Sequence, residues 1–206
     1  MGLVLPFLMR PKLIFQELWA RTKDWDDPPD EDIVEAWGTW KKVLLQLKQI
    51  QIQRCIIPKK SMIKKSELHG FGDASTQAYG CAVYLCVEDT EGNRSSHLVI
   101  AKSRVAPSKR ITLPRLELLA SYITARLINY VTEAFNGMIN EVFAWSGSKI
   151  ALSWIRKPSN NLKTFVANRV ESSHQSRSRQ IEILSRGPEP SRLGYERNLY
   201  PPTIQK

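Results

Sequence analysis

The feature that most constrains this chain is a change in the spacing of its apolar residues. Between residues 66 and 155, alternating apolar residues predict three strands joined by turns, and helical spacing then predicts one long helix before a further strand and a shorter helix. The predicted strands are Leu68–Gly72, Tyr79–Glu88, Ser96–Lys102 and Asn140–Trp145, and the predicted helices are Leu113–Phe135 and Ser148–Ile155. This order predicts an α/β fold with an antiparallel meander and a crossover helix.

Helical spacing also flanks these elements. Residues 7–22 and 33–47 predict a helical hairpin ahead of the sheet, because an acidic stretch with two prolines separates them. An extended basic segment is expected at 50–65. After the sheet, Leu162–Glu171 predicts another helix. Ser172–Gln180 lacks apolar alternation and is expected to be a loop or poorly ordered, and the last twenty residues are expected to be extended.

The positive charge is concentrated in the second half of the chain. Residues 1–100 contain 13 Lys+Arg and 13 Asp+Glu, whereas residues 101–206 contain 17 and 7, an excess that equals the whole net charge of +10. A basic half beside a neutral half indicates contact with a polyanion, most simply nucleic acid. A basic surface without any partner would give the same composition.

The cysteines and the first residues bear on location. Three cysteines without metal-ligand spacing show no disulfide framework, and Cys81 and Cys86 lie in an apolar run that predicts buried thiols. This usage fits a reducing compartment, so we expect an intracellular protein, cytoplasmic or nuclear and not secreted. The first nine residues are apolar but too short to span a bilayer and have no basic leader, so neither membrane attachment nor a signal peptide is expected.

Two acidic residues stand at element ends. Asp73 closes the first predicted strand, and Glu117 lies in the first turns of the long helix. Carboxylates that converge from such ends can bind Mg²⁺, which prefers hard oxygen ligands. Each residue also has a simpler interpretation, because Asp73 could cap a turn and Glu117 could be an exposed residue favoured by the helix dipole.

Four blocks of the chain resemble the pol polyprotein of BEL/Pao-type retrotransposons, from the end of the reverse transcriptase into its ribonuclease H. These blocks are His69–Ser75, Ala101–Pro107, Thr112–Leu118 and Lys163–Val170, and they occur in the order of the family. The resemblance implies a ribonuclease H-like fold with an N-terminal helical hairpin. It also implies three parts: a helical connector at 1–65 that follows a reverse transcriptase, a ribonuclease H-like domain at 66–187 with a degenerate late part, and an extended tail at 188–206.

The same resemblance implies an activity, namely hydrolysis of the RNA strand of RNA–DNA hybrids by two-metal catalysis with Mg²⁺. Asp73 would be the bridging ligand, and Glu117 would hold one ion and help to orient the scissile phosphate. The family usually has Asp where this chain has Gly147, and Asn-Pro-Ala-Asp where it has 179–182, so Glu182 is the candidate late ligand. We therefore expect this copy to be catalytically impaired.

The expected partners are an RNA–DNA hybrid or another nucleic acid, and the reverse transcriptase part of the parent polyprotein. A basic cluster between the third strand and the long helix is expected to contact the phosphate backbone, although a solvated charged loop is the simpler interpretation. The cluster consists of Lys102, Arg104, Lys109, Arg110 and Arg115.

Other functions and other residues stay open at this point. The chain could be a non-catalytic nucleic-acid-binding module or a decayed fragment, and an aspartic protease is disfavoured because Asp73-Ala74-Ser75 lacks the glycine of that motif. His69 is expected on a strand surface and His174 in solvent, where it could at best assist product release. Trp145 and Trp154 are expected in the core and not as stacking platforms.

Overall fold

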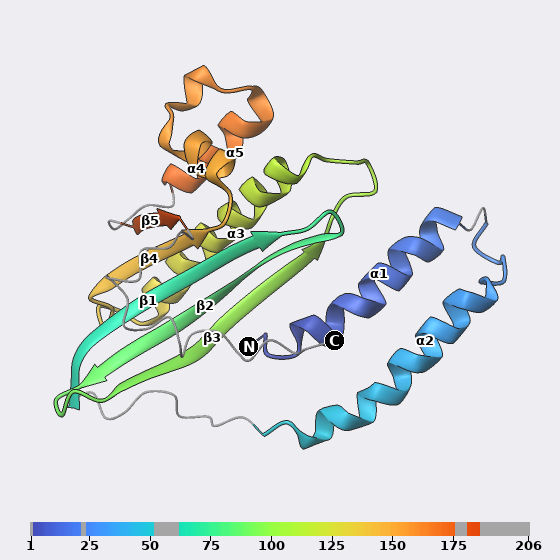
Figure 1. The fold of residues 1–206 in the computed structure, drawn as a ribbon, viewed down its shortest axis with the longest axis horizontal. Coiled ribbons are helices and arrows are strands. Elements are labelled where there is room, and N and C mark those ends of the chain that lie inside the picture. Colours follow the sequence, from blue (N-terminus) through green and yellow to red (C-terminus); the bar gives the residue numbers. More distant parts are fainter. Residues whose placement is uncertain (1, 22–23, 52–61, 176–180, 186–206) are drawn as a thin grey trace.

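A computed structural model of the chain describes residues 2–21, 24–51, 62–175 and 181–185, and it contains one mixed sheet (Figure 1). The strand order across the sheet is β3-β2-β1-β4-β5, in which β1 to β3 are antiparallel and β4 and β5 run parallel to β1. The strands are β1 (Ile63–Ala74), β2 (Ala78–Asp89), β3 (Arg94–Val105), β4 (Glu141–Ser146) and β5 (Ile181–Ser185).

The predicted meander is present, with strands longer than their apolar patterns. Its second turn is closed by Asp89, whose side-chain Oδ1 accepts hydrogen bonds from the backbone N–H groups of Glu91 and Asn93 at 2.9 and 2.8 Å. Gly92 has a φ of 86° there, a left-handed conformation that glycine adopts without steric cost.

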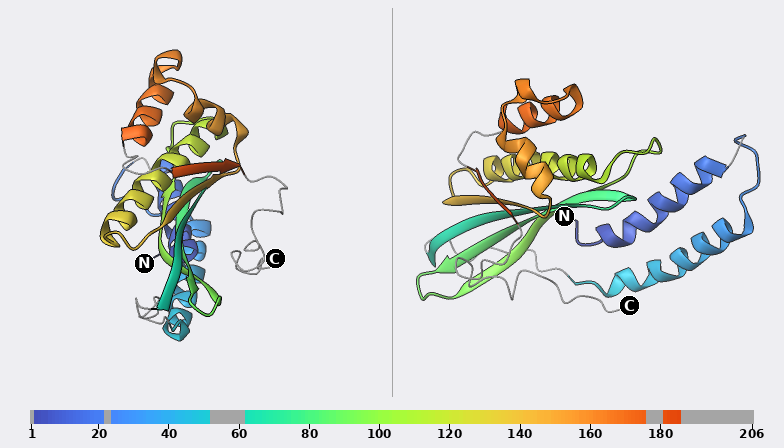
Figure 2. Two further views of the ribbon diagram at one scale, coloured as in Figure 1. Left: turned by 90° about the vertical axis from the view of Figure 1, so that its left-hand side faces the viewer. Right: turned by 45° about the horizontal axis from the view of Figure 1, so that its top comes forward.

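Helix α3 (Leu113–Ala134) covers one face of the sheet, as Figures 1 and 2 show. Its buried residues recur at helical spacing and meet the inward side chains of β1, β2 and β4, which together form the main core. The helical members of that core are Leu116, Ala120, Ile123, Leu127, Ile128 and Val131. Asn136, with a φ of 39°, and Gly137 follow the helix in left-handed conformations and end it.

Two shorter helices, α4 (Lys149–Arg156) and α5 (Thr164–Gln175), pack on the outer side of α3 around Leu118. The hydroxyl of Ser148 caps α4 by accepting a hydrogen bond from the Ala151 N–H at 3.2 Å. Helix α5 continues to Gln175, so the loop predicted from Ser172 is wrong for its first four residues, where no glycine or proline stops the helix. Residues 176–180 lie outside the described residues.

Strand β5 was not expected from the sequence. It pairs in parallel with β4, from Val142↔Ile181 to Ser146↔Ser185. A five-residue strand is too short to be stable alone, so it forms because β4 offers an open edge of backbone hydrogen-bonding groups.

The predicted hairpin is present as α1 (Leu5–Arg21) and α2 (Glu31–Leu44), followed by the 3₁₀ helix η1 (Leu45–Gln49). Of the predicted extended segment at 50–65, residues 52–61 lie outside the described residues, and the segment ends inside β1. The hairpin meets the sheet where α1 runs beside β3, and Gln16 Nε2 donates to the Ala106 carbonyl at 2.6 Å. Among the helices in the described ranges, none combines the length and apolar content that a membrane span requires.

Candidate metal and nucleic-acid site

The predicted site residues on β1 and β4 lie at one edge of the sheet. Gly72 of β1 is paired with Ser146, the last residue of β4, and the next residues along the chain are Asp73 and Gly147. Because β1 and β4 are parallel, their carboxyl ends meet at the same edge. Asp73 is exposed there.

Two glycines bring α3 and Glu117 to this edge. A Cβ atom on Gly70 would lie 2.6 Å from Ile128 Cδ1, and one on Gly72 would lie 2.6 Å from Thr124 Oγ1 and 3.2 Å from the carbonyl carbon of Ala120. As β1 advances, its contacts therefore move back along α3 toward the start of the helix. Glu117 lies almost one turn before Ala120, so it is level with the end of β1.

The two carboxylates approach this edge from different sides. Strand alternation places Asp73 on the face of β1 that carries Phe71, whereas Gly70 and Gly72 face α3. Glu117 is a half-buried residue of α3, and its Oε2 atom is shielded from solvent. The chain thus brings Asp73, Glu117 and Gly147 to one end of the sheet.

Gly147 is an open position at this edge. It is exposed, and a Cβ atom added to it would meet nothing within 4 Å. Its backbone lies outside the left-handed region that favours glycine, so an aspartate fits there without strain.

The carboxylate ligands at this end of the sheet are of the type that Mg²⁺ prefers, but they are too few to form a complete site. Asp73 and Glu117 offer carboxylate oxygens, the ligands that this ion prefers. Within the described part of the chain, however, no group of three or more His, Cys, Asp or Glu residues could hold a metal ion. Gly147 stands at the position where the sequence resemblance implies a third carboxylate.

Glu182 lies elsewhere along the sheet. In β5 it is paired with Phe143, which is paired with His69, four residues before Asp73. At about 3.3 Å per residue, its backbone is roughly 13 Å back from the strand ends. The register of β5 therefore does not bring Glu182 together with Asp73 and Glu117. The other late candidate, His174, lies in the last turn of α5.

The predicted basic cluster gathers at the same end of the sheet as Asp73. Lys102 and Arg104 flank Ser103 on β3, and Ser103 is joined through Gly80 of β2 to Asp73. Lys109 and Arg110 lie in the loop from β3 to α3, and these four basic residues are exposed.

Arg115 differs from the other basic residues because it is half-buried against α5. Its guanidinium carbon lies 5.3 Å from the centre of the Phe165 ring. A residue outside the predicted set, Arg169, places its guanidinium carbon 4.2 Å from the centre of that ring. One indication that Arg169 matters was present in the sequence, because it lies in the matched block Lys163–Val170, but no role was predicted for that block.

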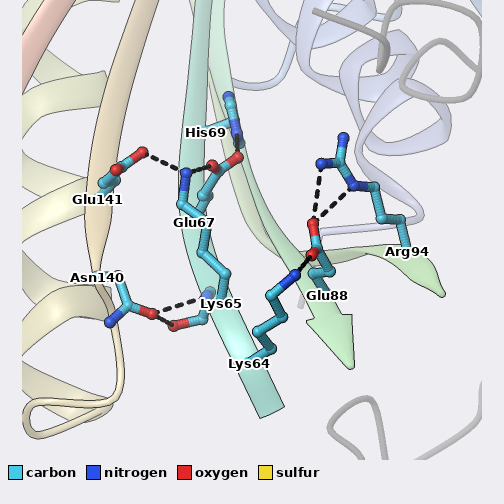
Figure 3. A network of polar contacts seen from close by, with 9 residues as sticks. Lys64, Lys65, Glu67, His69, Glu88, Arg94, Asn140 and Glu141 are labelled. Carbon is cyan, nitrogen blue, oxygen red and sulfur yellow. Dashed lines mark hydrogen bonds and ion pairs between the residues drawn. The ribbon is translucent and has the colours of Figure 1, made fainter. Parts of the chain in front are cut away.

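The start of β1 carries a separate polar network (Figure 3). The prediction for His69 is wrong, because this residue is fully buried and stacks on Phe143 at 4.9 Å. Trp145 Nε1 donates to His69 Nδ1 at 3.2 Å. Because the indole N–H can only donate, Nδ1 accepts and His69 carries its proton on Nε2. Nε2 donates to Glu67 Oε2 at 3.2 Å. Trp154 is half-buried against the second core cluster, as predicted. Trp145 is half-buried outside the core clusters, because it lies on the face of the sheet that carries Phe71 and stacks on that ring.

Lys65 completes this network by pairing with Glu67 at 2.6 Å and with Glu141 at 2.9 Å. The hydrogen bond from His69, helped by Lys65, lowers the pKa of Glu67 from 4.5 to about 2, although burial opposes the shift. Nearby, Glu88 is held by Lys64 and Arg94 at 2.7 and 2.9 Å. These contacts stabilise the start of the sheet and lie away from the candidate site.

The solved structures with similar folds include several ribonuclease H proteins. RNase H1 from the halophilic archaeon Halobacterium salinarum NRC-1 is 11% identical over 58% of this chain and 84% of that chain, with a TM-score of 0.35. The PFV RNase H domain is 12% identical over 64% and 83%, with a TM-score of 0.38. A foamy viral protease-reverse transcriptase in complex with dsDNA is 11% identical over 87% of this chain but 34% of that chain, with a TM-score of 0.48.

A search of curated proteins found no match. A family model described as the Pao retrotransposon-like RNaseH-like domain matches residues 1–148, which include the hairpin, the meander, α3 and β4. The predicted resemblance and the ribonuclease H-like α/β fold are thereby confirmed. The chain belongs to the family of Pao retrotransposon-like RNaseH-like domains.

Proposed function

We propose that this chain is a retrotransposon ribonuclease H-like module that binds RNA–DNA hybrids and whose hydrolysis of the RNA strand is impaired. The observation that supports the proposal is that Asp73 and Glu117 lie at the same end of the sheet as Gly147, an exposed and open position. A basic cluster at the same end supports contact with phosphates.

Asp73 and Glu117 are the residues that would hold Mg²⁺. Bound Mg²⁺ would supply Lewis-acid chemistry at a phosphate oxygen and favour attack by water. The strand and the helix fix the two carboxylates, and the half-buried setting of Glu117 strengthens its electrostatic effect. Gly147 supplies neither charge nor ligand, and loss of one preorganised group costs about 3 kcal/mol, or roughly a hundred-fold in rate.

The proposal includes the three-part organisation of the chain, with a connector at 1–65, the nuclease-like domain at 66–187 and a tail at 188–206. The connector would join the domain to a reverse transcriptase part of the same polyprotein. Support comes from the hairpin, which has its own aromatic contacts and meets the sheet along β3.

The test is cleavage of a hybrid with a labelled RNA strand in Mg²⁺ by the chain itself and by Gly147→Asp. We expect Gly147→Asp to cleave at least about ten-fold faster, since it restores the third carboxylate. Adding Asp73→Asn to Gly147→Asp should remove this gain in rate. Adding Glu182→Gln to Gly147→Asp should leave the rate unchanged, because the register of β5 keeps Glu182 away from Asp73. Equal and rapid cleavage by the original chain and Gly147→Asp would show that this copy is not impaired.

A second candidate is a module that grips hybrids without cutting them. The basic cluster supports it, because Lys102, Arg104, Lys109 and Arg110 are exposed although Gly147 offers no carboxylate. Salt-dependent binding together with absence of cleavage in both the original chain and Gly147→Asp would select this function.

A further inference from the structure

The helical hairpin of α1 and α2 leaves a large apolar surface uncovered. Within the described part of the chain, nine of the thirteen exposed large apolar side chains lie in residues 3–50. Helix α1, which is described throughout, has no buried residue, and α2 has only Ile33. Such a surface marks an interaction site. We propose that this chain forms a homodimer in which the hairpins of two copies pack against each other in opposite directions.

Three of the uncovered side chains form a stripe along α1. Leu8, Phe15 and Trp19 recur at intervals of seven and four residues, so they lie on one side of the helix. They are 38%, 51% and 66% exposed, although the aromatic rings of Phe15 and Trp19 contact other rings of the hairpin. In Figure 1 the hairpin stands beside the sheet and away from α4 and α5, which do not cover the stripe.

Helix α2 adds to the same face of the hairpin. Arg21 of α1 pairs with Asp32 of α2 at 2.8 Å, so these two residues lie on one side of the hairpin. Residues two apart point to nearly opposite sides of a helix, since each residue turns the helix by about 100°. Trp19 and Val34 therefore both lie on the side away from that ion pair. Val34 is 54% exposed, so the apolar face extends across both helices.

Gly38 lies in the middle of this face. It follows Val34 by four residues and is therefore on the same side of α2. Glycine in a helix interior costs about 1 kcal/mol relative to alanine. A Cβ atom on Gly38 would meet nothing within 4 Å, so packing within the described residues does not require this glycine. A partner helix would use it, because glycine allows another backbone to approach closely.

The charge along the hairpin identifies the partner as a second copy of this chain. The tip, residues 24–35, contains seven Asp+Glu and no Lys+Arg. The base, residues 1–15 and 36–50, contains five Lys+Arg and no Asp+Glu. Antiparallel hairpins place each tip against the base of the other copy, so a twofold axis produces two favourable contacts. Parallel hairpins would place like charges together.

Antiparallel pairing also matches the side chains along α1. Leu8, near the base, meets Trp19 of the second copy, which is near the tip. Lys12, between them on the same side of α1, meets Phe15 of the second copy, whose ring can cover the lysine stem and attract its ammonium group. Large apolar groups therefore meet across the whole stripe.

The size of the face predicts a weak dimer. Helix α1 has 17 residues, so the face is about 25 Å long, and two adjacent helices make it about 20 Å wide. It therefore offers about 500 Å² per copy, less than the roughly 800 Å² that each partner buries in a stable complex. We expect a dissociation constant on the order of 1–100 µM.

The test is sedimentation of the full chain at low salt, from about 1 to 200 µM. We expect Trp19→Ser and Gly38→Leu each to raise Kd at least about ten-fold, the first by removing an anchor and the second by filling the centre of the face. Leucine is the better helix former, so Gly38→Leu leaves the hairpin folded. Tyr130→Ser, on α3, is the matched control because Tyr130 is 64% exposed, and its Kd stays within about two-fold of the original.

A charge exchange tests the antiparallel arrangement. Glu31→Lys/Glu35→Lys reverses charge at the tip, and Lys41→Glu/Lys42→Glu reverses charge at the base, all at exposed positions. Each double variant alone repels its own copy, and we expect its Kd to rise at least about ten-fold. A mixture of the two should associate about as tightly as the original chain, because every tip–base contact again joins opposite charges.

Three outcomes would overturn the inference. The first is an original chain that stays monomeric over the whole concentration range, which would leave the face to another occupant such as the reverse transcriptase part. The second is a dimer that Trp19→Ser weakens no more than Tyr130→Ser does, since it would use another surface. The third is a mixture of charge variants that fails to associate although circular dichroism shows both to be folded. None of these results depends on hybrid binding or cleavage, so the proposed function is tested separately.

Discussion

At the scale of single residues, two glycines of β1 set how closely α3 approaches the sheet. We expect Gly72→Ala to destabilise the protein by about 1–3 kcal/mol, because the new methyl group would meet Thr124 Oγ1 and the backbone of Ala120. Thr124 is not free to turn away, since its hydroxyl donates to the Ala120 carbonyl at 2.7 Å. Urea unfolding measures the effect, and Gly38→Ala in α2, with open space around the Cβ position, is the control with the opposite expected sign.

Glu67 makes the stability of the folded state depend on pH. Its pKa lies near 2 in the folded state, below the ordinary 4.5, so its contribution is present above about pH 4.5 and is lost as the pH falls toward 2. At about 1.4 kcal/mol per unit of pKa, the contribution is roughly 3 kcal/mol at most. Urea unfolding between pH 5 and pH 2 should show a smaller loss for Glu67→Gln, which keeps the hydrogen bond to His69. Equal losses in the original chain and Glu67→Gln would contradict this prediction.

Residue roles that depend on distant partners could not be predicted from the sequence. His69 alternates like a surface residue, but Glu67 and Trp145 satisfy both of its ring nitrogens and allow its burial. Arg169 acquires its position only because α5 packs against α3. Asp73 and Glu117, by contrast, could be placed in advance because each stands at the end of an element with a clear apolar period.

At the scale of elements, apolar spacing predicted the order of the strands and helices as far as α5 but not their ends. The strand predicted as Leu68–Gly72 begins at Ile63, because its polar first residues pair with β2 and with Glu141. β5 escaped prediction for a related reason, since its backbone hydrogen bonds to β4 stabilise it and an apolar run of only five residues does not identify a strand by itself. Local pattern therefore predicts an element, and the neighbouring element determines its length.

The helical hairpin depends on one aromatic cluster. Trp40 stacks on Phe7 at 5.2 Å between ring centres and packs in a tilted arrangement against Trp37 at 4.8 Å, and its Nε1 donates to the Phe7 carbonyl at 3.2 Å. We expect Trp40→Ala to loosen α1 and α2 by about 2 kcal/mol, less than for a fully buried tryptophan, while leaving the sheet intact. Hydrogen exchange by mass spectrometry should show faster exchange in both helices and unchanged exchange in β1 and β2. Faster exchange throughout the protein would show that the hairpin and the sheet unfold as one unit.

At the scale of the whole molecule, acidic and basic residues are concentrated in different places. Residues 24–35, at the tip of the hairpin that stands beside the sheet in Figure 1, contain seven Asp+Glu and no Lys+Arg. The exposed basic residues of β3 and of the loop before α3 lie at the end of the sheet that also holds Asp73. If the proposed function holds, we expect a nucleic-acid duplex to be repelled by the tip and attracted to the strand ends.

This arrangement predicts that the place of the basic residues, and not only the total charge of the chain, determines binding. The double variant Lys109→Gln/Arg110→Gln and the control Lys41→Gln/Lys42→Gln remove the same charge from exposed sites, the first beside α3 and the second on α2. We expect the first to reduce the slope of log K against log salt for hybrid binding by about 2 and the second to leave it nearly unchanged, because only contacts with phosphates release counterions. Anisotropy titrations between about 50 and 200 mM salt measure both slopes. Equal slopes would mean that the net charge of the chain, and not the loop before α3, attracts the duplex.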